Sequence, residues 1–497
     1  MARYWLGIDF GTSGVRAIAV DERGKVVANV RSGVASAQQS GGMGDSSVSK
    51  SVPNLSYQPP SYQLTQVASW RAGLVQVLTS LPLVVRSGLV GIIIDGTSAT
   101  VVLTDETGVP VTPVLTYADR ADAVSLGVIS AMAPQGHLAA SPTATLPKVW
   151  QLWHGLHSGI YQKDQPTALE QGEDGARGQN NLGNSVFRDA DNNIYVMHQA
   201  DLCGYWLHGR MGITDYHNGL KLGYDAVQLV YPAWLRDGLD DHPPLPQLHR
   251  KLRLPEVLAP GEPVGLIQSE WVETLGIAPG CRIGAGTTDS TAAFLASIAP
   301  SPPRLGMAVT SLGSTMVLKV LAAAPLTDLG YGVYSHRWDQ DGVTYWLVGG
   351  ASNCGGQVLR QFFSDQELRE LSAAIDPQFD SPLDYYPLPQ VGERFPVNDP
   401  DLVPRLSPRP EDPVAFLHGL FTSMARIEAQ GYGVLRDLGA PLPHKIYTAG
   451  GGAQNAVWTQ LRQRQMEHRF SPAPEVLAAQ ETEAAYGAAL LARMKLG

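Results

Sequence analysis

Cysteine is scarce in this chain of 497 residues, and its three copies lie far apart. Cys203, Cys281 and Cys354 form no Cys-x-x-Cys pair, so the pattern indicates neither a disulfide framework nor a cysteine-based zinc site. Cysteine used in this way is typical of a reducing compartment. We therefore expect a cytoplasmic protein.

Long hydrophobic runs and clusters of positive charge are also missing. Apolar runs such as 90–94 are far too short to span a bilayer, and Asp9 and Arg16 interrupt the stretch that a signal peptide would need. Acidic residues outnumber basic ones, 46 to 36, with no basic stripe. Nucleic acid and membranes are therefore not expected as partners, whereas backbone dipoles could still bind a small anion.

The length of the chain favours two domains, because one hydrophobic core does not extend over so many residues. We place the boundary after the segment 275–280, which gives domains at 1–284 and 285–497. Two segments, 36–61 and 163–193, are polar and rich in Ser, Gly, Asn or Pro. They are interpreted as surface insertions, because they carry too little apolar surface to form a core.

One design occurs in both halves of the sequence: a turn of glycine and hydroxyl residues between two apolar strands. In the second half, a further strand runs into a triple glycine that precedes a helix. The expected strands are 4–10, 15–20, 25–30, 89–94, 304–310, 315–321 and 446–449, with a further hairpin of 101–103 and 110–115. The main expected helices are 67–81 and 454–467.

The first turn, in "GIDFGTSG", resembles a phosphate-binding loop but excludes two common kinds. No Lys follows Gly14, as a Walker A loop requires, and a strand rather than a helix comes next, unlike a Rossmann fingerprint. What remains is a hairpin turn that offers backbone N–H groups and the hydroxyls of Thr12 and Ser13. Asp9 at the strand end could hold Mg²⁺, directly or through water. An ordinary glycine-rich turn is the alternative.

Three later segments carry similar chemistry. In "IGAGTTDS", Asp289 precedes a helical stretch, where it could cap the helix or accept a proton from a substrate hydroxyl. The turn at 312–315 and the loop at 450–455 could each be a tight turn and nothing more. Their order and domain-scale separation favour a shared function.

The order of these motifs resembles the FGGY carbohydrate kinases, a family within the actin-like ATPase superfamily that includes glycerol kinase, xylulokinase and ribulokinase. The motifs run nearly from end to end of the chain. They are "GIDFGTSGVRAIAVD", "IDGTSATVVLTDETG", "SPTATLPKVWQLW", "GAGTTDSTAAF", "AVTSLGSTM", "GGASNCGGQVLRQF", "YTAGGGAQNAVWTQL" and "ETEAAYGAALLA".

The resemblance implies an α/β fold with two actin-like, ribonuclease-H-like ATPase domains flanking a cleft, the N-terminal one for sugar and the C-terminal one for nucleotide. It implies ATP as co-substrate and Mg²⁺, with Asp289 as catalytic base and Asp9 assisting Mg²⁺ and the sugar. The implied ATP-binding residues are Gly11, Thr12, Ser13, Gly313, Ser314, Thr315, Gly450, Gly451, Gly452 and Asn455.

The segment after the strand 89–94 indicates the sugar. Xylulokinases carry Gln-Met-His-Gly there and glycerol kinases an Arg-Glu pair, whereas this chain has "DGTSAT". Together with "YADRAD" at 117–122, this stretch is similar to D-ribulose kinases of the cyanobacterial and plant type. The resemblance implies phosphorylation of D-ribulose to D-ribulose 5-phosphate, with Thr97 and Ser98 as sugar contacts beside Asp9 and Asp289, in a monomer or homodimer.

Two other functions stay open: a kinase for D-xylulose or a polyol, and an actin-like ATP-binding protein without catalysis. His154 and His157 lack the Glu of a helical zinc motif and are interpreted as surface or packing residues. Trp150 and Trp153 are expected in the core. Asp215 lies in a stretch where the family often has an Asp near the sugar, but no proton-transfer role is assigned to it.

Overall fold

A computed structural model of the chain describes residues 2–12, 14–33, 65–158, 160–162, 193–241 and 252–497. Within these ranges the chain divides into two units. The first comprises 1–225, 229–290 and 488–497, and the second 226–228 and 291–487. Apart from Asn193, the two predicted insertions lie outside the described residues. The boundary predicted after residue 284 remains a prediction.

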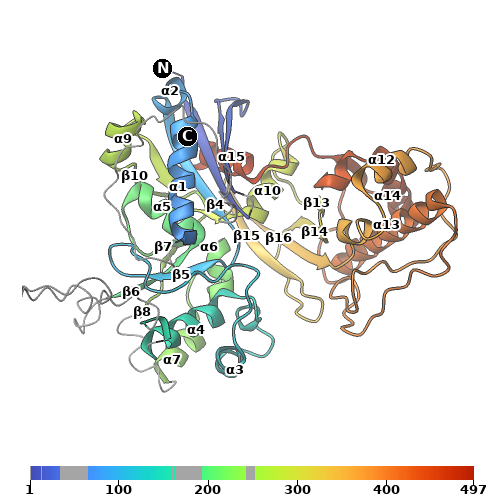
Figure 1. The fold of residues 1–497 in the computed structure, drawn as a ribbon, viewed down its shortest axis with the longest axis horizontal. Helices are drawn as coiled ribbons and strands as arrows, with labels where there is room; N and C mark the ends of the chain where they lie inside the picture. Colours follow the sequence, from blue (N-terminus) through green and yellow to red (C-terminus); the bar gives the residue numbers. More distant parts are fainter. Residues whose placement is uncertain (1, 13, 34–64, 159, 163–192, 242–251) are drawn as a thin grey trace, which may run out of the picture. The chain divides into compact units, whose positions relative to one another are not determined.

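The first unit is built on a seven-stranded sheet (Figure 1) with the order β10-β11-β4-β1-β2-β3, in which β12 also pairs with β4. β1, β2 and β3 form an antiparallel meander, whereas β4 runs parallel to β1, and β11 and β12 run parallel to β4. The bounds are Tyr4–Gly11 for β1, Gly14–Val20 for β2, Val26–Gly33 for β3, Leu89–Gly96 for β4, Pro263–Leu266 for β10, Arg282–Gly284 for β11 and Thr287–Thr288 for β12.

Side chains along β1 point alternately to the two faces of this sheet, and this alternation explains how the sheet packs. Leu6, Ile8 and Phe10 are buried on one face, in a cluster that also includes residues of α1 (Thr65–Ser80) and α5 (Gln199–His208). β4 is a continuous apolar run, which is typical of a strand with both faces covered. The sequence-based strands 4–10, 15–20, 25–30 and 89–94 and the helix 67–81 are confirmed with shifts of a few residues at their ends.

A second apolar cluster of the first unit lies around a three-stranded sheet, β5-β6-β8. Trp150 and Trp153 belong to this cluster and are buried, as expected. The remaining elements of the unit are α2 Leu83–Arg86, β5 Val101–Thr104, α3 Ala123–Met132, η1 Leu138–Ala140, α4 Thr145–His157, η2 Ile160–Gln162, β6 Ile194–His198, β7 Ile213–Asp215, α6 Tyr216–Gly219, η3 Leu220–Leu222, α7 Ala233–Asp241, β8 Leu252–Arg253, β9 Glu256–Leu258 and α9 Ser269–Leu275.

The second unit has a six-stranded sheet with the order β15-β16-β14-β13-β17-β18. The strands are β13 Met307–Leu312, β14 Met316–Ala322, β15 Tyr334–Gln340, β16 Val343–Ser352, β17 Lys445–Ala449 and β18 Glu475–Ala478. The helices are α11 Gly356–Leu359, α12 Asp365–Ser372, α13 Pro413–Asp437, η4 Gly451–Gln454 and α14 Ala456–Arg469, while α10 Asp289–Ile298 and α15 Ala484–Leu496 have residues in both units.

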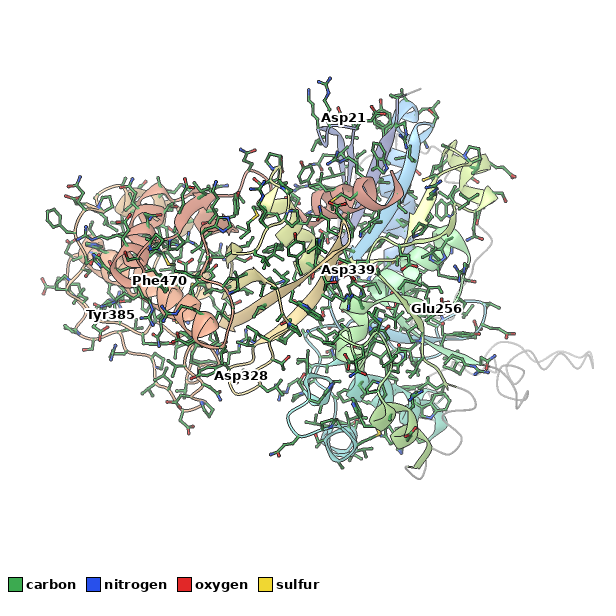
Figure 2. All side chains as sticks on the ribbon, turned by 180° about the vertical axis from the view of Figure 1, so that it is seen from behind. Asp21, Glu256, Asp328, Asp339, Tyr385 and Phe470 are labelled. Atoms are coloured by element: carbon green, nitrogen blue, oxygen red, sulfur yellow. The ribbon has the colours of Figure 1, made fainter. Side chains whose placement is uncertain are left out.

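Helices α13 and α14 pack together beside the second sheet, and their interior is aromatic. Phe421 of α13 and Trp458 of α14 stack in parallel, with ring centroids 4.7 Å apart. Tyr385, labelled in Figure 2, packs edge-on against Phe416 and donates its hydroxyl proton to the carbonyl of Pro408 at 2.6 Å. These contacts anchor the long segment between α12 and α13 to the helical layer.

Each sheet contains the same core arrangement, so the repeat expected from the sequence is present. In the second unit, β13 and β14 form an antiparallel hairpin and β17 runs parallel to β13, as β1, β2 and β4 do in the first. The two hairpins therefore bring both glycine turns to the carboxyl end of the first strand of their sheet. Over the residues that the structure describes, we find no helix with the length and apolarity needed to cross a bilayer.

Candidate active site

Three carboxylates gather at one edge of the sheet of the first unit. Asp9 near the end of β1 and Asp95 near the end of β4 are direct neighbours in the parallel pairing of these strands. On the other side of β4, Asp95 pairs with Thr287 of β12, and Asp289 follows two residues later as the first residue of α10. The carboxyl ends of parallel strands form the edge at which α/β sheets bind ligands. The fold thus collects acids that are far apart in the sequence.

Asp95 is the most buried of these acids, with no exposed surface. Its pKa is raised well above the ordinary value, first by burial and then by the negative charges of Asp9 and Asp289 and a hydrogen bond with Asp9. Asp95 therefore tends to hold a proton beside Asp9. Asp95 lies in the motif "IDGTSATVVLTDETG", and no role was predicted for it from the sequence. The signal in the sequence that could have identified it is an Asp at the end of an apolar run that forms a buried strand.

The carboxyl pair also bears on metal binding. Apart from the bond to Asp9, neither oxygen of Asp95 has a hydrogen-bond partner among the described residues. Mg²⁺ keeps several waters and takes one or two carboxylates, and a protonated Asp95 is a poor ligand for it, so Asp9 is the acid of this pair that could hold the ion. Across the described ranges, no group of three or more His, Cys, Asp or Glu is placed to enclose a metal ion. The site therefore fits a partly hydrated ion and not a closed protein cage.

The first glycine turn adjoins this acid cluster. It joins β1 to β2, with Gly11 opposite Gly14, and Gly14 has φ of 137°, a conformation that side chains disfavour. A Cβ on Gly11 would lie 3.6 Å from both carboxylate oxygens of Asp9, so the turn backbone borders Asp9 closely. Thr12 is exposed, and Ser13 lies outside the described residues.

The turn after β4 holds both residues predicted to contact the sugar. Thr97 is buried, and its backbone N–H and its hydroxyl both donate to Oε1 of Gln199 at 2.9 Å. The Thr97 hydroxyl also lies 2.6 Å from that of Thr100. Ser98 is half-buried, and its hydroxyl makes no hydrogen bond to another described residue. Hydrogen bonds within the protein thus occupy Thr97, whereas the hydroxyl of Ser98 is available to bind a ligand.

In the second unit, the predicted phosphate turn Gly313–Thr315 joins β13 to β14, with Gly313 and Ser314 exposed. A segment after β16 supports it from behind. Gly356 N–H donates to the Gly313 carbonyl at 2.8 Å, and Gln357 N–H donates to the Ser314 carbonyl at 3.2 Å. These two bonds fix the turn through its carbonyl groups and do not use its N–H groups. Within the turn, the N–H of Gly313 donates to the carbonyl of Thr315 at 3.1 Å.

The buried carboxylate of Glu393 fixes the supporting segment in turn. It accepts the hydroxyl proton of Ser352 at 2.6 Å and the backbone N–H of Asn353 at 2.8 Å. These bonds hold the end of β16 and the chain that leads to Gly356. The sequence motif "GGASNCGGQVLRQF" thus has a physical role in bracing the turn.

The predicted loop of the adenosine side lies beside that turn. Gly450 has φ of 83°, and a Cβ on it would lie 2.5 Å from the carbonyl of Leu312, the last residue before the turn. Gly451 opens the short helix η4, and Asn455 caps α14 by accepting the N–H of Trp458 at 2.9 Å. The two loops lie at the carboxyl ends of β13 and β17, which are adjacent and parallel. Their roles in ATP binding remain predictions.

Other candidate residues have structural environments. His154 is exposed on α4, in keeping with a surface residue. All three cysteines are buried and free, and burial raises the pKa of the Cys281 thiol to about 12. Thiols in such surroundings stay protonated near neutral pH and are poor nucleophiles.

Asp215 caps α6 by accepting the N–H groups of His217 and Asn218, and it also accepts from Nδ2 of Asn218 at 2.6 Å. It is fully buried, and burial, followed by the charge of Asp201, raises its pKa to about 7, although the hydrogen bonds from Asn218 and the charge of His198 oppose this. Native Asp215 therefore stays protonated at pH values where the unfolded chain is already ionised.

This difference predicts a pH-dependent effect of Asp215→Asn. Because the folded pKa is raised, Asp215 contributes stability at low pH that is lost as the pH rises toward 7, and Asn, which does not titrate, removes that slope. From about pH 5 to about pH 8, the variant should gain roughly 2–3 kcal/mol relative to the wild type. The free energy of unfolding, measured for both proteins at several pH values in this range, checks the prediction. A constant difference between the two proteins would contradict it.

Comparisons with known proteins show what the chain resembles in sequence and in fold. The model of the C-terminal domain of the FGGY family of carbohydrate kinases matches residues 308–496. Solved structures of similar fold include a gluconate kinase from Lactobacillus acidophilus (17% identity, TM-score 0.69, covering 100% of this chain and 90% of that one). A xylulose kinase from Rhodospirillum rubrum is similar at 18% identity and TM-score 0.69, with coverage of 100% and 90%. A glycerol kinase from Plasmodium falciparum with ADP has 13% identity and TM-score 0.69, with coverage of 99% and 90%.

The fold is therefore the two-domain actin-like, ribonuclease-H-like α/β fold, as predicted. The match covers the C-terminal part of the chain, at residues 308–496, and there the chain is similar to the C-terminal domain of the FGGY carbohydrate kinases.

Proposed function

We propose that the chain transfers the γ-phosphoryl group of ATP to the terminal hydroxyl of D-ribulose, giving ADP and D-ribulose 5-phosphate. The observation that carries the proposal is the gathering of Asp9, Asp95 and Asp289 at the carboxyl edge of one sheet, in a chain with an FGGY C-terminal domain. Phosphoryl transfer needs positioning, charge neutralisation and one proton acceptor, and this cluster can supply all three.

In the proposed mechanism, Asp289 accepts the proton of the terminal hydroxyl as its oxygen bonds to the γ-phosphorus. The bond from that phosphorus to the β–γ bridging oxygen breaks, and the electron pair leaves with ADP. Asp9, beside the protonated Asp95, orients the sugar and would bind the Mg²⁺ ion. When bound, that ion neutralises charge on the transferring phosphate.

Backbone N–H groups are proposed to bind the phosphates, at Gly11, Thr12 and Ser13 in the first unit and at Gly313, Ser314 and Thr315 in the second. Gly450, Gly451, Gly452 and Asn455 are proposed to bind the adenosine side. The exposure of Gly313 and Ser314 and their backbone support favour this assignment. We also infer a cytoplasmic location from the scarce, unpaired cysteines.

The sugar is inferred from what the turn after β4 offers. "DGTSAT" has no His, Arg or Glu, and Ser98 provides a short hydroxyl in a half-buried position. Such a site leaves room for a ketopentose and still offers a hydrogen bond. Ser98 and Thr97, with Asp9 and Asp289, are the proposed sugar-binding residues.

A panel of substrates tests this choice. With saturating ATP and Mg²⁺, ADP release should be greatest, as kcat/KM, for D-ribulose, and we expect discrimination of about 10-fold or more against D-xylulose, glycerol and gluconate. Preference for D-xylulose would refute the choice of sugar and keep the reaction class. ATP binding without turnover on any sugar, together with unchanged basal hydrolysis in Asp289→Ala, would favour a non-catalytic ATP-binding protein.

A further inference from the structure

Lys148 is a fully buried lysine in the first unit, located on α4 within "SPTATLPKVWQLW". Its ammonium donates to the backbone carbonyl of Ala99 at 3.0 Å and to that of Thr116 at 2.7 Å. No described carboxylate forms an ion pair with it. Burial of a charged group is unfavourable, and the nearby charge of Asp119 offsets this only in part, since burial still lowers the pKa of Lys148 to about 8. This position therefore calls for a reason beyond packing.

The first carbonyl belongs to a strained residue. Ala99 is buried and has φ of 63°, a left-handed conformation that costs an alanine about 1 kcal/mol or more. Such conformations persist only where the surroundings enforce them, and they occur often at ligand sites. Here the ammonium of Lys148 holds the Ala99 carbonyl in place.

The rest of the turn is held as firmly. Gln199 accepts both donors of Thr97, and the backbone N–H of Gln199 donates to the Thr100 carbonyl at 3.1 Å. Thr100 also lies within hydrogen-bond distance of Thr97 through its hydroxyl. Ser98, between two braced residues, is the member of the turn with an available hydroxyl.

The second carbonyl held by Lys148 connects this turn to the segment 116–122. The hydroxyl oxygen of Thr100 accepts the backbone N–H of Tyr117 at 3.0 Å, and Thr116 donates to Asp119 at 2.6 Å. One ammonium therefore joins "DGTSAT" to Thr116, the residue directly before "YADRAD"; these are the two stretches from which the sugar was inferred.

We propose that Lys148 is a positioning residue for the sugar: by holding the carbonyls of Ala99 and Thr116, it presets the turn that presents the Ser98 hydroxyl to the substrate. The proposal rests on the proposed function, because it needs a sugar bound at Ser98. A preset hydroxyl binds without the entropy cost of ordering a loop, so loss of the brace weakens sugar binding specifically.

The first test is Lys148→Met, which keeps the apolar length and removes the donors. We expect KM for the ketose to rise by about 10-fold or more, as for loss of charge-assisted hydrogen bonds, while KM for ATP stays within about twofold. Lys221→Met, in the nearby helix η3, is the matched control for loss of a positive charge and should change neither constant by more than about twofold.

A double-mutant cycle distinguishes positioning from general destabilisation. Because Lys148 is proposed to act through Ser98, Lys148→Met should have little further effect on the ketose KM in a Ser98→Ala background. Independent, multiplicative effects of the two substitutions would overturn the proposal.

A second variant covers the case in which Lys148→Met does not fold. Ala99→Gly removes the strain at φ of 63° and makes the turn more flexible, so it should keep Tm within a few degrees while raising the ketose KM about threefold or more. An unchanged ketose KM in this variant, or in folded Lys148→Met, would overturn the proposal in an active enzyme. Wild-type protein without turnover on any sugar would instead refute the proposed function.

Discussion

Asp289→Asn is expected to lower kcat for ketose phosphorylation by a factor of about 10²–10⁴, the usual contribution of a general base. Asn has nearly the same shape and can still accept hydrogen bonds, but it cannot take a proton at neutral pH. KM for ATP should therefore change little. Steady-state ADP release measured with D-ribulose, together with ATP binding by calorimetry, checks both parts.

The control for this prediction is Asp21→Asn. Asp21 is a half-buried residue in the turn between β2 and β3 (Figure 2), where hydrogen bonds from the backbone N–H groups of Lys25 and Arg23 lower the pKa of its carboxyl. Its loss should leave kcat unchanged, because the turn is not part of the acid cluster. Retention of wild-type kcat in folded Asp289→Asn would refute the assignment of the base.

Gly355→Ala is expected to give the second large effect, on ATP binding. A Cβ at this position would lie 2.4 Å from the carbonyl oxygen of Ser314 and 2.6 Å from Cα of Thr315. Because both contacts are with backbone, the phosphate turn itself must shift. We expect KM for ATP to rise about 10-fold or more and stability to fall by about 1–3 kcal/mol, with the ketose KM within about twofold.

Gly127→Ala is the matched control. Gly127 lies within α3, and a Cβ there would meet no atom within 4 Å, so alanine should stabilise the helix slightly. ATP and ketose constants are expected to stay at wild-type values. A normal ATP KM in Gly355→Ala would show that the Gly313–Thr315 turn either tolerates the shift or does not bind phosphate.

Local patterns predicted the hairpins well. In β1 and β2, apolar residues flank a glycine turn, and the same pattern recurs in β13 and β14, so short-range turn chemistry sufficed. The pattern failed at 110–115, where a second hairpin strand was expected. That segment makes only isolated bridges, Pro110 with Thr104 and Leu115 with Val101. Its backbone still bonds to β5, through the N–H of Val111 to the Leu103 carbonyl and the N–H of Leu115 to the Val101 carbonyl.

Only part of the candidate site was predicted. Its residues were identified one motif at a time, and contacts between distant motifs were not accessible in this way. Asp9 and Asp289 were expected from motifs, but the burial of Asp95 and its contact with Asp9 depend on how β1 and β4 pair. Thr97 was expected to contact the sugar, and its hydroxyl proves to be engaged by Gln199, more than a hundred residues away. Neither partner can be identified from spacing alone.

The sequence by itself determined the apolar strands, the glycine turns between them and the order of the motifs that indicate a carbohydrate kinase. Each of these depends on residues close together in the chain. Tertiary structure alone decided that Asp95 shares its environment with Asp9, that Lys148 is buried against the Ala99 carbonyl, and that Gly355 packs against the backbone of Ser314 and Thr315. The reason is physical: pKa, burial and close contact depend on neighbours that chain folding brings together from distant positions.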